Sequence, residues 1–245
     1  MFIDFRVVLP KYHAILDRGL SSGLGNRNGQ MCIEAAVCSA LGLNHSDDPQ
    51  CVAKSVRSFK INLNDSKWSS PTARAAGLRR LGVAQLGSKG IVDDLEFAKR
   101  IAKKTIQKLL PPLFREIFHD SECISAALRC EQEGTNYAAS YAGNAANYAA
   151  SYAVNAASYA ASYAANAASY AANAANNAAS YAASYAANAA SYAANAANAA
   201  YATNTCRRGA KYLILSANLA IEVLTELESP GIEWMDWNEN KQKGE

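Results

Sequence analysis

Charged residues are missing from a long central part of this 245-residue chain. Residues 136–204 contain no Asp, Glu, Lys, Arg or His. Residues 1–135 hold 19 basic and 14 acidic side chains, and residues 205–245 hold 5 and 7. The resulting net charge of +3 is too small to predict a nucleic-acid partner.

Long hydrophobic runs are absent as well. No run reaches the roughly 20 residues that a membrane span needs. The start of the chain, Met1-Phe-Ile-Asp-Phe-Arg6, lacks the basic region and the apolar region of a signal peptide. We therefore expect a cytoplasmic protein with no membrane contact.

The cysteines match no zinc-ligand pattern and form no CxxC pair. The sequence therefore predicts no metal and no cofactor, and we expect reduced, buried thiols. The six cysteines are Cys32, Cys38, Cys51, Cys123, Cys130 and Cys206.

Helix signals are frequent in residues 1–135, which we interpret as an all-α head domain. Ser70-Pro71 is typical of a helix start, Gly82 of a stop, and Pro111-Pro112 should end a helix. Only residues 2–9 have strand-like content. Helices are predicted over residues 10–20, 30–41, 49–61, 70–81, 93–110, 113–118 and 120–134.

Two features of the head are weak candidates for anion binding. Arg27 lies in a glycine-rich loop before the helix predicted at Gln30, where free amides could hold an anion. The loop lacks the preceding strand and the spacing of a phosphate loop, so a flexible loop is the plainer interpretation. Arg100, Lys103 and Lys104 share one helix face with Lys108, a pattern usually typical of a solvated face.

Cys32 is a weak candidate for catalysis. Gln30 and Cys32 at a helix start resemble the nucleophile region of papain-type peptidases, and a helix start can lower a thiol pKa. The match covers only these few residues, and no motif places a partner histidine among His13, His45 and His119. A buried structural cysteine is the competing interpretation.

Six copies of an 11-residue repeat occupy residues 136–201. Eleven residues make close to three α-helical turns, so each repeat position stays in line along a helix. We expect one long helix, roughly 100 Å if unbroken, which Gly143 could soften and Asn176-Asn177 could bend. The first tyrosine column is Tyr137, Tyr148, Tyr159, Tyr170, Tyr181 and Tyr192, and the second is Tyr141, Tyr152, Tyr163 and Tyr185.

The repeat positions sort into three sectors at about 98° per residue. Positions 1, 5 and 9 are Ser or Asn, positions 2 and 6 are mostly Tyr, and the other six are almost all Ala. Alanine loses little side-chain entropy on burial, so we predict a buried alanine face, flanking tyrosines and a solvated Ser/Asn stripe. The predicted interface residues are Ala161, Ala172, Ala183, Tyr148, Tyr159, Tyr170 and Tyr181.

Residues 205–245 return to ordinary sequence, with an amphipathic helix predicted over 210–227 and stopped by Ser229-Pro230-Gly231. This helix needs a partner, and we expect it to be the head. The repeat must then fold back, unless a second chain supplies the surface.

Five stretches of the chain resemble uncharacterised bacterial and phage-borne proteins that insert an alanine-rich repeat between the same two flanks. The resemblance implies an intracellular protein, of the host cytoplasm if a phage encodes it, and supplies no catalytic residue. The stretches are GQMCIEAAVCSALGL, DDPQCV, LNDSKWSS, LRRLGVAQLGS and YLILSANLAIEVLTELESPG.

The repeat also resembles alanine-rich helical antifreeze proteins, which repeat every eleven residues. Those proteins use regularly spaced threonine beside the alanine face, whereas threonine is missing from all six repeats here. Ice binding through the alanine face is therefore kept only as an alternative.

The charge-free repeat favours a non-enzymatic assembly or interaction protein. We expect a head, a repeat helix that self-associates into a homo-oligomer, and a C-terminal helix that closes onto the head. A further protein partner stays open, and the enzyme alternative depends on Cys32 alone.

Overall fold

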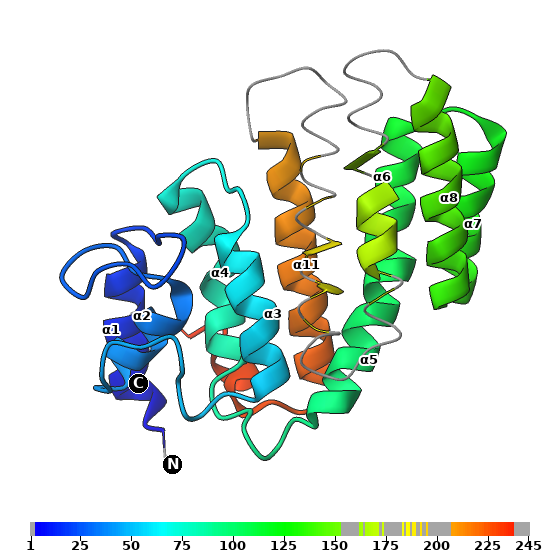
Figure 1. Ribbon diagram of the computed structural model, residues 1–245. Coiled ribbons are helices and arrows are strands. Elements are labelled where there is room, and N and C mark those ends of the chain that lie inside the picture. Colours follow the sequence, from blue (N-terminus) through cyan, green and yellow to red (C-terminus); the bar gives the residue numbers. More distant parts are fainter. Residues whose placement is uncertain are drawn as a thin grey trace.

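The computed structural model of the protein describes residues 3–152 and 207–237, and between them residues 162–163, 165–171, 173, 183, 185–186, 188–189, 192 and 195 (Figure 1). These described residues form helices and no sheet, which confirms the predicted all-α class. The elements are α1 (Phe5–Leu16), α2 (Ile33–Ala40), α3 (Lys54–Asp65), α4 (Pro71–Ala84), α5 (Asp94–Lys104), the π-helix η1 (Thr105–Leu109), α6 (Leu110–Ile117), α7 (Ser121–Glu133), α8 (Asn136–Tyr152), α11 (Arg207–Glu226) and the 3-10 helix η2 (Pro230–Trp234).

Helix α1 replaces the strand content expected over residues 2–9, so that expectation is wrong. The Asp4 carboxylate accepts a hydrogen bond from Arg6 N at 3.1 Å and caps the helix. The apolar residues recur at three- and four-residue spacing along the whole helix, a period that the short run over 2–9 conceals. The buried residues of α1 are Val8, Leu9, Tyr12, Ile15 and Leu16.

Local capping signals predicted several helix ends correctly. Ser70 Oγ accepts from Ala73 N at 3.0 Å at the start of α4, and the Asp93 carboxylate accepts from Glu96 N at the start of α5. Helix α7 ends at Gly134, whose φ of 62° is the left-handed conformation that glycine adopts readily. These ends follow from residues within one helical turn.

Helix α3 begins at Lys54, later than the start predicted near Pro49. Ala53 offers no side-chain cap, and the Asp94 carboxylate accepts hydrogen bonds from both Ser55 N and Ser55 Oγ at 2.7 Å. The cap therefore comes from the first turn of α5, which the local sequence does not reveal.

Two expected helix stops are wrong. Helix α4 continues through Gly82, because a Cβ there would lie 1.9 Å from Tyr12 Oη, so the glycine admits the Tyr12 ring from α1. Pro111 and Pro112 lie in the first turn of α6, where a proline needs no amide hydrogen.

Helix α11 docks on the head, as expected for the C-terminal helix. It packs against α4, α5 and η1, and lies between α4 and α5 in Figure 1. The Tyr212 hydroxyl donates to a Glu116 carboxylate oxygen at 2.5 Å, and Ser229 Oγ donates to Ala84 O at 2.6 Å. These contacts fix both ends of α11.

The described repeat residues do not form one straight helix. The nearest atoms to a Cβ at Gly143 belong to Ser169, Ala165 and Ala168, at 3.3 to 3.7 Å. Residues this far apart in one straight helix would be separated by about 33 Å or more at 1.5 Å per residue. The repeat therefore folds back on itself, and α8 continues through Gly143 without a break.

A second fold-back follows from the tyrosine rings. Tyr163 packs on Tyr192 with ring centroids 6.3 Å apart, and Tyr170 packs on Tyr185 at 5.7 Å. The segment that contains Tyr163 and Tyr170 thus runs antiparallel to the segment that contains Tyr185 and Tyr192, because the first tyrosine of each segment meets the second tyrosine of the other. Both pairs have their sequence midpoint between residues 177 and 178, and Asn176-Asn177 themselves lie outside the described residues.

Candidate functional site

A buried ion pair lies in the centre of the head. Lys60 Nζ of α3 lies 3.3 Å from Glu34 Oε1 of α2, and neither side chain reaches solvent. Gln85 Nε2, at the end of α4, donates to Glu34 Oε2 at 3.0 Å. Lys60 Nζ, Glu34 Oε1 and Gln85 Oε1 have no partner in hydrogen-bond geometry. The cluster joins three helices through a polar contact that is only partly satisfied.

Burial shifts both members of the pair toward their neutral forms. It raises the pKa of Glu34, against the opposing attraction of Lys60, and it lowers the pKa of Lys60. Removing charge from water is costly, and mutual attraction recovers part of that cost. Each member of the pair is therefore the main counter-charge of the other in the packed centre of the head.

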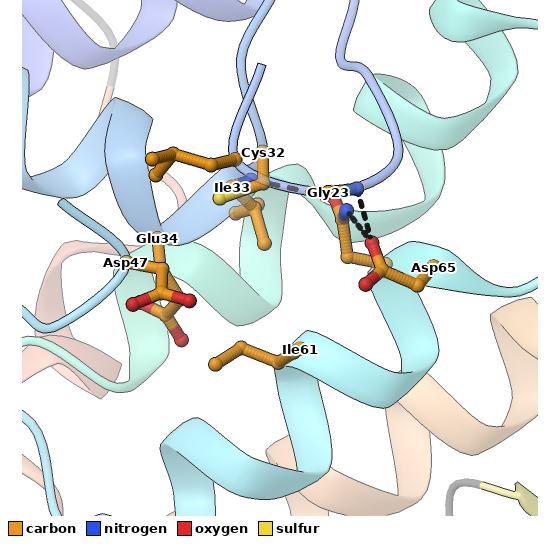
Figure 2. A pocket seen from close by; sticks show the side chains of 9 residues that line it. Gly23, Cys32, Ile33, Glu34, Asp47, Ile61 and Asp65 are labelled. Carbon is orange, nitrogen blue, oxygen red and sulfur yellow. Dashed lines mark hydrogen bonds between the residues drawn. The ribbon is translucent and has the colours of Figure 1, made fainter. Parts of the chain in front are cut away.

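A cavity of about 30 Å³ adjoins this pair. Figure 2 shows Cys32, which caps α2, and Glu34 of α2 on one side of it, and Ile61 and Asp65 of α3 on the other. The Asp65 carboxylate accepts from Gly23 N at 2.7 Å and so holds the 23–29 loop over one side. The volume has room for about one or two water molecules, far less than an organic substrate requires.

Cys32 lines the same cavity but is not activated as a nucleophile. Its sulfur is the N-cap of α2 and accepts from Ala35 N at 3.3 Å. Burial raises the pKa of the thiol, and this outweighs the opposing effects of that amide and of Lys60. Glu34 and Lys60, and no histidine, are the ionisable groups that act on the thiol.

The three histidines lie elsewhere. His13 Nδ1 is 3.0 Å from Arg79 Nη1, and His45 Nε2 is 3.4 Å from Gly25 O. His119 is exposed just before α7. The structure thus brings Cys32 together with an ion pair that sequence reasoning missed, rather than with the histidine that papain-type chemistry needs.

The predicted anion-binding residues are not brought together. Arg27 is exposed in the loop before α2, while Lys103 is exposed on α5. Arg100 Nη1 lies 3.2 Å from a Glu226 carboxylate oxygen, and Lys104 Nζ lies 2.8 Å from the other. The basic stripe on α5 therefore neutralises acidic residues of α11 and helps that helix dock.

A larger depression of about 240 Å³ lies at the start of α3. Its lining combines three basic side chains, Lys54, Arg57 and Lys89, with two acidic ones, Asp48 and Asp94. Arg57 Nη2 also lies 2.9 Å from the Asp47 carboxylate, and Asp94 caps Ser55.

Burial in the repeat follows the three sectors expected from the sequence. Every repeat alanine whose side chain the structure describes is buried, and the described Ser and Asn side chains are exposed or half-buried. Among the predicted interface residues, Ala183 is buried, Tyr170 is half-buried and Tyr148 is 60% exposed. Ala161, Ala172, Tyr159 and Tyr181 lie outside the described residues.

The outer face of α8 is the most accessible candidate for binding. Tyr137 and Tyr148 are 63% and 60% exposed, and Ser140, Asn144 and Asn147 between them are exposed. The Arg129 guanidinium of α7 stacks over the Tyr137 ring, 4.6 Å from its centroid. Apart from this neighbour, the face is uncharged and carries only aromatic, hydroxyl and amide groups.

Sequence reasoning missed the Glu34–Lys60–Gln85 cluster. One signal was available, since Glu34 interrupts the apolar run from Met31 to Val37. A charged residue within a buried helix requires a partner. The identity of that partner depends on how α3 and α4 pack against α2, and no local sequence pattern predicts that packing.

Comparisons with protein families, with curated proteins and with solved structures found no match to this chain. Within the described ranges, no helix is long and apolar enough to span a membrane. The same residues contain no group of three or more His, Cys, Asp or Glu side chains suited to a metal ion.

Proposed function

We propose that this protein is a non-enzymatic assembly or interaction protein, and that it associates with further copies of itself through the outer face of its folded repeat. The proposal includes a cytoplasmic setting, and the host cytoplasm if a phage encodes the chain. A homo-oligomer is the expected state.

The observation that supports this proposal most directly is the chemistry of the exposed face of α8. Tyr137, Ser140, Asn144, Asn147 and Tyr148 form a continuous outer surface without charge. Tyrosine offers a large contact area with few rotatable bonds, and Ser and Asn offer adaptable hydrogen bonds, which is the composition of antibody binding loops. Such a surface suits protein recognition, and these five residues include no Asp, Glu, His, Lys or Cys.

The interior of the repeat supports the same proposal. The alanine faces pack helix against helix within one chain, where a Cβ at Gly143 would lie 3.6 Å from Ala165 O and 3.7 Å from Ala168 Cβ. A segment that already packs against copies of its own sequence is suited to packing against another chain. Because residues 136–204 carry no charge, no electrostatic repulsion keeps two copies apart.

The alternatives have less support. Ice binding requires an exposed alanine face, and every repeat alanine whose side chain the structure describes is buried. Thiol catalysis requires a reactive Cys32, and that thiol is buried with a raised pKa beside a cavity of water size.

Sedimentation velocity on the full chain, from about 1 to 100 µM, tests self-association. We expect a reversible oligomer, and the double variant Ser140→Lys, Asn144→Lys should dissociate it by placing like charges on apposed faces. The control Asn28→Lys, Ser69→Lys adds the same charge to exposed loops on the α1–α4 side of the molecule and should sediment like wild type. A monomer at every concentration would overturn the proposal.

A further inference from the structure

Four tyrosine rings form a continuous row where two antiparallel segments of the repeat meet. The ring centroids of Tyr163 and Tyr192 lie 6.3 Å apart, those of Tyr192 and Tyr170 4.9 Å, and those of Tyr170 and Tyr185 5.7 Å. Each step crosses from one segment to the other, and each falls within the usual range of aromatic contacts. We call this row the tyrosine stack.

The central pair of the tyrosine stack is the closest and the most nearly parallel. The Tyr170 and Tyr192 rings are tilted by 15°, against 37° and 43° in the two outer pairs. The pKa of Tyr170 is raised, chiefly by hydrogen bonding between its hydroxyl and that of Tyr192. The two hydroxyls therefore lie on the same side of the central pair, and the ring carbons ortho to them are neighbours.

Phenols are the side chains of the repeat that lose an electron readily. The other side chains of residues 136–201 are Ala, Ser and Asn, with one Gly and one Val. The four rings of the tyrosine stack are half-buried, so a small oxidant in solution can reach them. The described cysteines, whose thiols would compete for an oxidant, are all buried. An oxidant therefore meets paired phenols before it meets a described thiol.

We propose that Tyr170 and Tyr192 are a site of oxidative cross-linking, at which a one-electron oxidant, such as a peroxidase intermediate or a photo-oxidised metal complex, joins the two rings as dityrosine. The oxidant removes one electron from each phenol, and each hydroxyl releases its proton to water. The two phenoxyl radicals then form one C–C bond between their ortho carbons. The hydrogen on each of these carbons moves to the oxygen of the same ring, so the protein loses two electrons and two protons in total.

The cross-link fixes the fold-back of the repeat. It joins positions 22 apart in the sequence and spans the chain reversal between them. A covalent link across a loop lowers the conformational entropy of the unfolded chain and so stabilises the folded form. It also keeps the two segments paired within one chain, which prevents their exchange with a second copy. The inference goes beyond the proposed function and does not depend on self-association.

Photo-oxidation of the full chain tests this site. The protein, at about 1 µM and so far below the effective concentration of two groups in one chain, is illuminated with a ruthenium polypyridyl complex. Persulfate accepts the two electrons and becomes two sulfate ions. Trypsin releases residues 130–207 as one peptide, because no Lys or Arg lies between Arg129 and Arg207. Wild type should yield this peptide with two hydrogens fewer, and chymotryptic mapping should place the link at Tyr170 and Tyr192.

Two matched variants identify the reacting pair. Tyr192→Phe keeps the ring but removes the hydroxyl, and it should lower the dityrosine yield by about tenfold because the coupling depends on two phenols held side by side. The control Tyr137→Phe removes a phenol that is 63% exposed on α8 and should leave the yield unchanged. Far-UV circular dichroism melts confirm that both variants fold, and after oxidation Tyr137→Phe should melt at a higher temperature than Tyr192→Phe.

Equal yields in the two variants, links formed only between chains, or wild type without dityrosine would each overturn the inference. A cross-linked protein that sediments as a monomer would support the inference and overturn only the proposed function. An oligomer without the Tyr170–Tyr192 link would do the reverse.

Discussion

Lys60 Nζ faces Glu34 Oε1 across 3.3 Å in the middle of the head, and neither side chain is exposed. The pair connects α2 to α3, and Gln85 extends the contact to α4. A buried ion pair contributes little net stability, but loss of one member leaves the other charged and unpartnered. The pair therefore adds little to the free energy of unfolding, but it disfavours any packing of the three helices in which Glu34 and Lys60 do not meet.

Substitution of one member of this pair should be far more damaging than substitution of both. Lys60→Met should lower the free energy of unfolding by about 3–5 kcal/mol at pH 7, because Glu34 is left buried without its counter-charge. The double variant Glu34→Gln, Lys60→Met should recover more than half of that loss. Urea denaturation of wild type, both single variants and the double variant gives the coupling free energy.

Acidification should partly rescue Lys60→Met. Burial raises the pKa of Glu34 above its ordinary 4.5, so the folded protein takes up a proton at a pH where the unfolded chain does not. The stabilisation is present at low pH and is lost as pH rises through the folded pKa. The variant should thus gain stability between pH 7 and pH 5, and a flat profile would show that Glu34 is solvated.

Cys32 should react slowly with thiol reagents. Burial raises the pKa of its thiol, and its exposed fraction is 5%. At pH 7.5 we expect labelling at Cys32 to be about tenfold or more slower in the folded protein than in the urea-unfolded chain. Peptide mapping by mass spectrometry identifies the labelled site, and labelling of Cys32 ahead of the other cysteines would revive the enzyme alternative.

Two glycine substitutions in helices should act in opposite directions. Gly82→Ala places a Cβ 1.9 Å from Tyr12 Oη and should cost about 1–3 kcal/mol, because the ring cannot stay in place. In Gly143→Ala the nearest atom is Ser169 Oγ at 3.3 Å, on an exposed side chain that can rotate. Thermal melts should show Gly143→Ala stabilised by about 0.5–1 kcal/mol from helix propensity. Destabilisation by both would show that the neighbours of Gly143 leave no room for a methyl group.

The contact between α5 and α11 should weaken in acid. The pKa of Glu226 is lowered, chiefly by its hydrogen bond from Lys104, so the stabilisation is present above the ordinary pKa of 4.5 and is lost as pH falls below it. Because Glu226 is 41% exposed, the expected size is only about 0.5 kcal/mol.

Lys104→Gln removes this contribution at pH 7, and the difference from wild type should shrink steadily as the pH falls below 4.5. Lys99→Gln is the control, since Lys99 is exposed and pairs with Glu96 on its own helix. A similar acid dependence in both variants would show that the effect does not come from the α11 contact.

Features decided within one helical turn could be predicted from the sequence. Ser70, Asp93 and Asp120 each cap the helix that follows them. The start of α3 could not, because its cap is supplied by Asp94, 39 residues from Ser55. The same limit concealed the partners of Glu34, which come from two other helices.

The sectors of the repeat were predictable because they depend only on the helical period. A fold-back was expected because the C-terminal helix needs to reach the head, but the number of segments was not predictable, since the same 11-residue register continues on both sides of each reversal. A single straight helix and a folded repeat differ in whether the alanine faces pack against another segment of the same chain. Gly143 and the ring of Tyr170 supply the contacts that identify the folded form.

The antiparallel tyrosine contacts of the repeat limit how such a chain can change its length. Because neighbouring segments run in opposite directions, each added segment brings the chain to the opposite end of the folded repeat. Gain or loss of one segment would leave α11 starting at the wrong end of its docking site between α4 and α5. Gains and losses in pairs of segments would preserve that docking, so parity, more than total length, is the property that recombination in this repeat must conserve.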